Sequence, residues 1–409
     1  MYPLVYPPMY PLKFHPVYKE KIWGGDALAR LFGRQLPPRR VGESWEIAAH
    51  PHGQSIVSNG PLAGTALVDL LKSRRDEIMG KTPLVPVAGG GDRERFPLLI
   101  KLLDCNDWLS VQVHPDDEYA RAYEGELGKT ESWVVLYAAP GAQIVYGLEP
   151  GTTRDEFAAA IAQNRVEEYL HKVEVRSGDV FSVPSGTVHA LGRGVVVAEI
   201  QQNSDTVYRV YDWGRLGDDG KPRELHVEKA LSVIDFSFSP AKAGGGRRQS
   251  EGLAAAPTAA GSLSRPANAA NPAADGDPAN FVTTGAATVT ANCCRTLLDA
   301  NDKYVIERIE LAGESEWTPA AEDRFSVFML LRGCCHVSGG GEELLLRAGD
   351  SILVPAAVTD LSFQARAKAI AKARAKARAM AGPQPQELSE TEAKSEPVVL
   401  LRAYVPDVG

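Results

Sequence analysis

"RSGDVFSVPSGTVHAL", residues 176–191, has the composition of one β-strand with a turn at each end. Gly178 suits the turn that enters a strand, and Pro184 and Gly186 suit the turn that leaves it. His189 follows where the next strand is expected to begin. The stretch therefore predicts a chain rich in β-structure, with one histidine placed at the start of a strand.

A second stretch repeats this pattern later in the chain. "RAGDSILVPAAVTDLS", residues 347–362, has the same frame G-D-x4-P, and in this frame Asp360 replaces His189. Repeated patterns of this kind indicate related structural units. We therefore predict two related β-modules, of which the first keeps a candidate metal ligand and the second has lost it. The active site is expected in the first module.

Upstream of the first pattern, "LSVQVHPDDEY", residues 109–119, alternates polar and apolar side chains. Successive side chains of a strand point to opposite faces, and those two positions apart lie roughly 6.5–7 Å from each other on one face. Ser110, Gln112 and His114 are therefore expected to share a face. The two valines between them are expected to pack on the other face, against the wall of the module.

Length and charge restrict the kind of protein. The chain has 409 residues, 44% of them hydrophobic, which suits two or three globular modules. Its net charge of -8 argues against a general nucleic-acid binder, because binding to the nucleic-acid backbone requires clustered positive charge. A small-molecule substrate is compatible with this composition.

The sequence also predicts a compartment. No run of 18 or more apolar residues occurs, and the start "MYPLVYPPMYPLKFHP" lacks the basic region and compact apolar core of a secretory signal. The five cysteines are odd in number and form no C-x-x-C pair, so we expect reduced thiols. These features predict a cytoplasmic protein with no membrane partner.

Composition divides the chain into parts. Strand-like runs fill most of residues 1–240, with helical spacing near 25–34, 65–80 and 153–170. Residues 241–280 are rich in Ala, Gly, Pro and Ser and are predicted to be a flexible linker. Residues 281–409 are predicted to form the second module, with a basic and then acidic insertion at about 364–396.

The spacing G-x5-P-x-G-x2-H between Gly178 and His189 resembles the second conserved motif of the cupin superfamily. The small β-barrels of that superfamily hold a divalent metal through histidines and a carboxylate. The resemblance implies a mainly β protein with two cupin-like β-barrel (jelly-roll) modules and a few helices packed on the first.

Four residues offer ligands of the types that such a metal needs. Gln112 and His114 share a predicted strand face, Glu131 opens the strand-like run in "GKTESWVVL", and His189 follows the turn described above. Two imidazoles, one carboxylate and one amide oxygen suit Zn²⁺ or a related divalent transition metal. Such a set would leave one coordination position for water or substrate.

Seven segments together resemble type I mannose-6-phosphate isomerase, in particular its short bacterial form. They are "YKEKIWGG", "VGESWEIAAHP", "FPLLIKLLD", "LSVQVHPDD", "GKTESWVVL", "VPSGTVHAL" and "EIQQNSDTVYRVYDWGR". The resemblance covers residues 11–239 and extends more weakly to the C-terminal module. It implies a metal-dependent aldose–ketose isomerase that interconverts mannose 6-phosphate and fructose 6-phosphate through an enediolate.

The same resemblance implies a role for each matching residue. One Zn²⁺ per chain would be held by Gln112, His114, Glu131 and His189. Arg209 and Lys129 would be catalytic, with Arg209 stabilising the enediolate and Lys129 a candidate for proton transfer. Lys101 and Ser110 would contact the sugar phosphate.

Two alternatives stay open from the residues alone. One is another metal-dependent cupin enzyme acting on a sugar or sugar phosphate, such as an oxygenase or epimerase. Such an enzyme is expected to have H-x-H where this chain has Gln112 and His114. The other is a non-catalytic sugar-binding module, against which the joint retention of the four ligands and Arg209 argues. The sequence leaves monomer and homodimer as alternatives.

Overall fold

The computed structural model describes residues 7–87, 94–239, 287–289, 293–366 and 397–406. The first module contains two antiparallel sheets that face each other. One has the strand order β14 (Val180–Val183), β11 (Glu131–Ala138), β16 (Val195–Gln202), β9 (Leu98–Cys105), β3 (Val41–Ile47), β2 (Val17–Gly25). The other has the order β13 (Leu170–Glu174), β12 (Gln143–Leu148), β15 (His189–Leu191), β10 (Val111–Val113), β17 (Tyr208–Tyr211).

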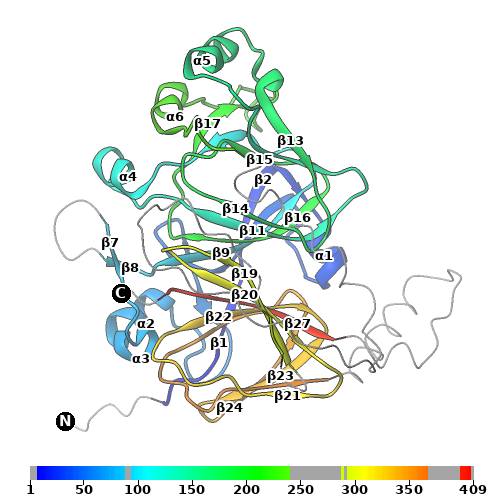
Figure 1. The fold of residues 1–409 in the computed structure, drawn as a ribbon. Helices are drawn as coiled ribbons and strands as arrows, with labels where there is room; N and C mark the ends of the chain where they lie inside the picture. Colours follow the sequence, from blue (N-terminus) through cyan, green and yellow to red (C-terminus); the bar gives the residue numbers. More distant parts are fainter. Residues whose placement is uncertain (1–6, 88–93, 240–286, 290–292, 367–396, 407–409) are drawn as a thin grey trace, which may run out of the picture.

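Alternation along these strands separates two apolar cores. Trp133, Phe181 and other inward side chains fill the space between the sheets. Val111 and Val113 face outward and pack in a separate cluster beneath helices α5 (Arg154–Ala162) and α6 (Val227–Val233) and the short 3-10 helix η1 (Val166–Tyr169). Figure 1 shows α5 and α6 covering this outer face. The polar residues of β10 are thereby left for the interior.

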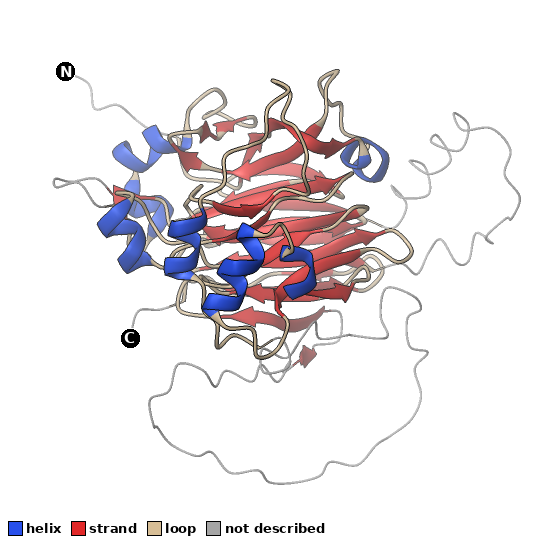
Figure 2. Ribbon diagram, turned by 90° about the horizontal axis from the view of Figure 1, so that it is seen from above, coloured by secondary structure: helices blue, strands red, loops and turns tan. Residues whose placement is uncertain are grey.

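The second module repeats this plan. Its larger sheet contains β18 (Ala287–Val289), β19 (Cys293–Ala300), β20 (Val305–Leu311), β27 (Val398–Tyr404), β22 (Ser326–Arg332) and β25 (Ser351–Val354). Its smaller sheet contains β21 (Glu316–Trp317), β26 (Ser362–Ala365), β23 (Cys334–Gly339) and β24 (Glu342–Arg347). One large apolar core includes Ile200 of the first module and Ile306 of the second, so the modules are packed firmly together. Figure 2 shows the resulting stack of strand layers.

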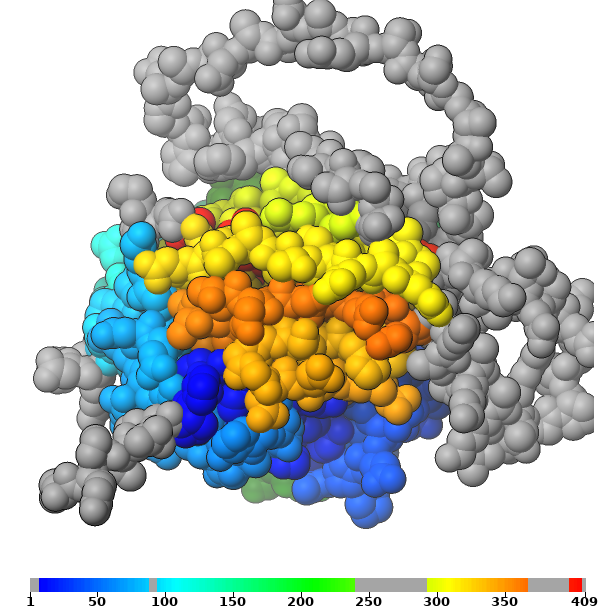
Figure 3. All heavy atoms as spheres, turned by 90° about the horizontal axis from the view of Figure 1, so that it is seen from below, coloured from blue at the N-terminus to red at the C-terminus, as the bar shows by residue number. Residues whose placement is uncertain are grey.

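The N-terminal segment belongs to both modules. Strand β1 (Leu12–His15) pairs with β25 on one side and with β6 (Ile56–Val57) on the other. The backbone N–H of Ala356 donates to the carbonyl of Ile78 at the end of helix α3 (Arg75–Met79), which follows α2 (Leu67–Ser73). Figure 3 shows the dark-blue N-terminal residues set beside the orange strands of the second module.

The remaining elements are short. They are helices α1 (Ala27–Phe32) and α4 (Asp117–Tyr123), and strands β4 (Ala49–His50), β5 (Gly53–Gln54), β7 (Val85–Pro86) and β8 (Glu94–Arg95). Helices occur in all three stretches where the sequence predicts helical spacing. None of the helices in the described ranges is long and apolar enough to cross a membrane.

The mainly β fold with two cupin-like modules and few helices is confirmed by this architecture and by the solved structure described below. The domain boundaries 1–240, 241–280 and 281–409 remain a prediction. The linker lies outside the described residues, as does the insertion at 364–396 apart from its first three residues. Strand β1, which the predicted boundaries place in the first module, pairs with β25 of the second module.

Candidate active site

Strand register brings the predicted site residues into one row. On β10, Gln112 is paired with His189 of β15 on one side and with Arg209 of β17 on the other. Directly paired residues of antiparallel strands have side chains on the same face. Because the valines beside Gln112 face outward, this row faces the interior of the first module. Ser110 and His114 flank the short strand, and the Ser110 hydroxyl donates to Gln112 Oε1 at 3.5 Å.

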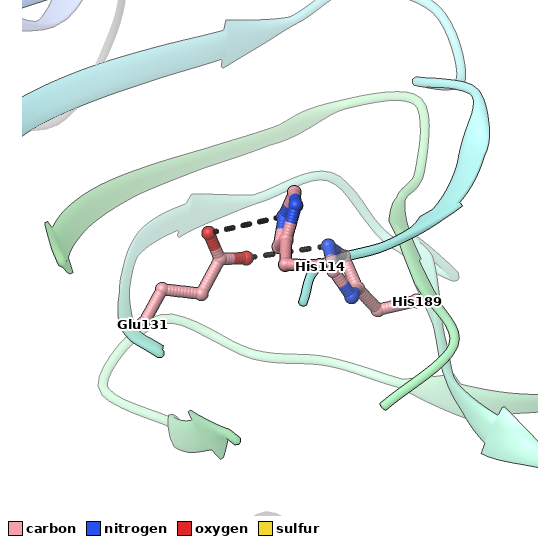
Figure 4. Close-up of side chains that lie close together, drawn as sticks. All are labelled: His114, Glu131 and His189. Carbon is pink, nitrogen blue, oxygen red and sulfur yellow. Dashed lines mark ion pairs between the residues drawn. The ribbon is translucent and has the colours of Figure 1, made fainter. Parts of the chain in front are cut away.

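Three buried side chains converge in this interior. Within the part of the chain that the structure describes, one group of His, Cys, Asp and Glu residues could hold a metal ion, namely His114, Glu131 and His189, whose ligand atoms lie within 4.8 Å of one another. His114 Nε2 is 3.6 Å from Glu131 Oε2, and His189 Nε2 is 3.3 Å from Glu131 Oε1 (Figure 4). All three residues are at most 1% exposed.

Backbone carbonyls fix the tautomer of both histidines. His114 Nδ1 lies 2.8 Å from the carbonyl oxygen of Thr206, and His189 Nδ1 lies 2.9 Å from that of Thr187. A carbonyl can only accept, so each Nδ1 carries the proton and each Nε2 offers a lone pair toward Glu131. Burial, followed by the charge of Lys129, lowers the pKa of His189 to about 4, and it also lowers that of His114. Both rings are therefore neutral, as metal ligands must be.

The fourth predicted ligand lies beside this group. Gln112 Nε2 is 3.3 Å from His189 Nε2. A rotation of the amide by 180° exchanges Nε2 and Oε1, which would place an oxygen next to the other ligand atoms. Glu131 Oε1 has no hydrogen-bond partner among the described residues. The donor set and this unsatisfied carboxylate oxygen both fit a divalent cation.

Lys129 is the nearest cation to these groups. Its Nζ donates to Glu131 Oε2 and lies 3.1 Å from His114 Nε2 and 3.9 Å from Glu199 Oε1. Burial raises the pKa of the Glu131 carboxyl, as does the charge of Glu199, whereas Lys129 opposes both. Lys129 thus offsets the negative charge of two buried carboxylates in a space that water barely reaches.

Lys101 lies further from the predicted metal ligands than Lys129 does. Its Nζ is 3.2 Å from Glu199 Oε1 and 3.9 Å from Glu43 Oε2, and the three residues lie on the neighbouring strands β9, β16 and β3 of one sheet. Burial acts to lower the pKa of Lys101, but the two carboxylates outweigh it and raise the pKa. The structure therefore separates Lys101 from the predicted metal ligands and keeps it as a permanent cation.

Arg209 occupies the half-buried end of the row. One guanidinium nitrogen donates to the backbone oxygen of Glu224 at 2.7 Å, while its buried Nε has no partner among the described residues. Burial lowers the pKa of Arg209, and Arg223 lowers it further. A guanidinium stays charged even then, so Arg209 offers an unused N–H donor to an anion in the interior.

Comparison with known proteins agrees with this geometry. Residues 11–132 match the model of the phosphomannose isomerase type I catalytic domain. "Mannose-6-phosphate isomerase ManA" of Bacillus subtilis is 48% identical over 231 residues, which cover 56% of this chain and 70% of the relative. "Mannose-6-phosphate isomerase" of Streptococcus mutans is 35% identical over 353 residues, which cover 86% of this chain and 95% of the relative. The chain belongs to the type I mannose-6-phosphate isomerase family.

A solved structure supports the same assignment. The crystal structure of the mannose 6-phosphate isomerase from Bacillus subtilis superposes with a TM-score of 0.70 at 30% identity, and the match covers 97% of this chain and 99% of that one. Structures of phosphomannose isomerase variants from Salmonella typhimurium are 14% identical, with TM-scores of 0.62 and 0.64, and show the common fold. The predicted resemblance to the type I isomerases is confirmed.

Glu199 is a residue of this isomerase site that the sequence prediction missed. It is 4% exposed and touches both lysines of the site. Burial acts to raise the pKa of Glu199, but Lys129 and Lys101 outweigh it and lower the pKa. The signal was present in "VVVAEIQQ" (β16), where a carboxylate interrupts a run of apolar residues. A charged residue inside a buried strand needs a charged partner, and this rule could have identified Glu199.

Glu43, beside this isomerase site, is expected to make the stability of the fold depend on pH. Burial acts to raise the pKa of Glu43, but Lys101 and Lys21 lower it to about 2, below the unfolded value of about 4.3. A carboxyl with a lowered folded-state pKa stabilises the fold above the unfolded pKa, and this stability is lost as pH falls through the folded pKa. We therefore expect wild type to have a larger free energy of unfolding than Glu43→Gln. This difference should have its full size above about pH 5 and become smaller as the pH falls toward 2. Urea titrations from pH 7 to pH 2 measure this difference, and one that stays constant over that range would contradict it.

The second module of the isomerase has an uncharged polar residue where the first has the predicted carboxylate ligand. Glu131 is paired with Val183, the residue before the proline of the first repeated frame. Ser326 is paired with Val354, the residue before the proline of the second frame. Ser326 therefore occupies the position that Glu131 has in the first module.

Each module also has an ion pair between two neighbouring strands of its larger sheet, and the positive and negative residues of this pair are exchanged between the modules. In the first module, Glu199 is paired with Lys101 across β16 and β9. In the second, Arg402 is paired with Glu307 across β27 and β20, and the guanidinium is 3.4 Å from that carboxylate. The second module has kept an ion pair at this place with the signs exchanged.

The expectation that Asp360 takes the place of His189 differs from the structure. Asp360 is exposed and accepts a backbone N–H from Gly340. His189 is paired with Gln112, and in the second module the equivalent pair is Phe363 with Trp317. The loop after β25 is longer than the loop after β14. Counting residues along the repeated frame therefore no longer gives the residue that the strand pairing makes equivalent. An aromatic pair thus lies in the second interior at the positions that the predicted metal ligands Gln112 and His189 have in the first.

Proposed function

We propose that this chain interconverts mannose 6-phosphate and fructose 6-phosphate with one divalent metal ion per chain, held by Gln112, His114, Glu131 and His189. The observation that carries the proposal is the convergence of two neutral imidazoles on an unsatisfied buried carboxylate oxygen, beside a buried lysine. The family assignment supports the reaction, since two relatives at 48% and 35% identity are both named mannose-6-phosphate isomerase.

Aldose–ketose isomerisation moves a carbonyl group from C1 to C2 of the sugar. A proton must leave one carbon and arrive at its neighbour, and negative charge develops on the two oxygens of an enediolate meanwhile. A metal ion bound at this site would supply positive charge next to those oxygens. Zn²⁺ fits the nitrogen and oxygen donors and takes part in no redox step, and another divalent transition metal would fit the same set.

Arg209 is proposed to stabilise the enediolate. A guanidinium does not give up its proton at neutral pH, so it acts as a donor and a charge and not as a base. Its buried Nε is the donor that lacks a partner among the described residues, and it lies in the same strand row as Gln112. An oxyanion that develops in the reaction would satisfy this donor.

The two lysines are proposed to have different tasks. Lys101 keeps its charge because Glu199 and Glu43 raise its pKa, so we assign it to binding an anionic oxygen of the substrate. Lys129 Nζ lies next to the ligand atoms of Glu131 and His114, and we assign it to proton transfer. Ser110, at the end of the same row, is assigned to the sugar.

Chelation tests the function directly. Fructose 6-phosphate formed from mannose 6-phosphate is measured in a coupled assay on purified protein, before and after chelator and with Zn²⁺ added back. We expect activity to be lost with the metal and restored with it, at one Zn²⁺ per chain because the described residues of the second module include no second ligand set. Binding of Zn²⁺ without any isomerisation would support another metal-dependent cupin enzyme. Binding of the sugar phosphate alone would support a binding module.

Three further assignments are proposals of the same kind. The five cysteines are odd in number and form no C-x-x-C pair, which supports a reducing, cytoplasmic location. The net charge of -8 argues against a nucleic-acid partner, and the family assignment supports a sugar phosphate. The oligomeric state, monomer or homodimer, is to be measured by light scattering.

A further inference from the structure

The turn between β19 and β20 in the second module lies against the back of the strand that carries Glu131. Asp299 accepts hydrogen bonds from the hydroxyls of Ser132 and Ser182. These two serines are paired with each other across β11 and β14. Figure 1 shows β19 and β20 directly beneath these strands. One carboxylate of the second module thus joins the two strands next to the proposed metal ligand.

The same turn adds a second buried contact. The Tyr304 hydroxyl lies 2.9 Å from Ser132 Oγ, and Ser132 and Tyr304 are both 0% exposed. The Ser132 hydroxyl gives its proton to Asp299, so Tyr304 is the donor in this contact. Asn301 Oδ1 accepts the backbone N–H groups of Lys303 and Tyr304 and fixes the turn itself. We call residues 299–304, which are the last two residues of β19 and the turn that follows them, the support turn.

The support turn also reaches the segment before Glu131. Lys303 Nζ is 2.9 Å from Asp117 Oδ2. Asp117 Oδ1 accepts the backbone N–H of Gly128 at 2.9 Å and the amide of Gln202 at 3.0 Å. Gln202 Oε1 in turn accepts the backbone N–H of Thr130 at 2.9 Å. The backbone on both sides of Lys129 is therefore tied, through Asp117, to the second module.

Close packing leaves this segment little freedom. A Cβ on Gly128 would collide with the backbone of Asp116 and Asp117, so only glycine allows the approach. The backbone N–H of Lys129 donates to the carbonyl of Pro115 at 3.0 Å. The segment from Gly128 to Ser132 is thus held by contacts at each of its positions, and Glu131 itself is paired with Val183 and Gln201 while its carboxylate faces the interior.

We propose that the support turn positions the metal centre, with Asp299 and Lys303 as positioning residues for Glu131 and Lys129. The inference rests on the proposed function, because it concerns the same site. A metal ligand keeps its geometry only when its supporting groups are themselves locked by packing and hydrogen bonds. The second module, whose described residues include no equivalent ligand set, supplies part of that support.

The test compares Asp299→Asn/Lys303→Ala with a matched control, Lys13→Ala. The Lys13–Asp350 ion pair (2.8 Å) resembles Lys303–Asp117 in length and exposure and also joins the N-terminal chain to the second module. Zn²⁺ affinity is measured by competition with a chromogenic chelator, together with the visible spectrum of the Co²⁺-loaded protein, kcat and KM. We expect the double variant to bind Zn²⁺ about 10- to 100-fold more weakly, with an altered Co²⁺ spectrum and a lower kcat. The control should stay within about twofold of wild type.

The outcomes separate the inference from the proposed function. A folded double variant with wild-type Zn²⁺ affinity and Co²⁺ spectrum would overturn the support turn, even if its thermal stability were lower. If the double variant does not fold, Lys303→Ala alone is the test, with a several-fold loss of affinity expected and Lys303→Arg expected to restore it. Wild-type protein that binds Zn²⁺ but isomerises nothing would refute the function and leave the affinity comparison decisive. Wild-type protein that binds neither metal would refute both.

Discussion

Glu131→Gln is expected to lose its bound metal and at least about 10³-fold in kcat/KM, because the substitution removes the one carboxylate on which both histidines converge. Glutamine keeps the size of the side chain, so the change is mainly one of charge. Metal content measured by mass spectrometry and the coupled isomerase assay check the result. Wild-type metal content together with wild-type activity would contradict it.

The same substitution should also lower stability. Lys129 loses its nearest carboxylate in an interior where it is 3% exposed, and breaking a buried ion pair from one side costs on the order of 3–5 kcal/mol. Urea unfolding of the metal-free proteins measures this cost without the contribution of metal binding. Glu174→Gln, which changes an exposed carboxylate on β13, is the matched control and should unfold like wild type.

Arg209→Ala is expected to lower kcat by about 10²- to 10³-fold while metal content stays at the wild-type level. Its guanidinium is proposed to act on charge that exists only during the reaction, and removing such a group lowers kcat more than it raises KM. Arg209→Lys should recover little, because the ammonium lacks an N–H at the position of Nε. Steady-state kinetics measure both effects.

Arg193→Ala is the control for Arg209→Ala. Arg193→Ala removes an exposed arginine from the loop before β16 and should leave kcat unchanged. If Arg209→Ala raised KM with kcat intact, Arg209 would bind the ground state of the substrate and not the enediolate.

Local patterns predicted those parts of the site that depend on one strand or one turn. The alternation around Gln112 placed it on the face opposite the valines, and the turn before His189 placed that histidine at the start of β15. Each inference needed only the period of two residues along a strand or the turn residues beside it. The assignment of roles to Arg209, Lys129 and Lys101 came from the family resemblance and stays a prediction.

Contacts between distant strands could not be predicted in the same way. The pairing of Glu199 with Lys101 depends on the register of β16 against β9, which no local period defines. Similarly, counting residues along the repeated frame made Asp360 the equivalent of His189, whereas the strand pairing makes Phe363 the equivalent residue. Counting fails where a loop changes length, because register is set by hydrogen bonds between strands and not by distance along the chain.

The pairing of β1 with β25 has a consequence for how the protein is made. Leu12 leaves the ribosome near the beginning of synthesis, but its partner Leu353 leaves near the end. During most of translation β1 therefore has β6 on one side and an open edge on the other, and open edges invite pairing with other chains. A nascent chain that ends before residue 351 contains the strands of the first module, but the edge of β1 that pairs with β25 stays exposed and open to pairing with another chain.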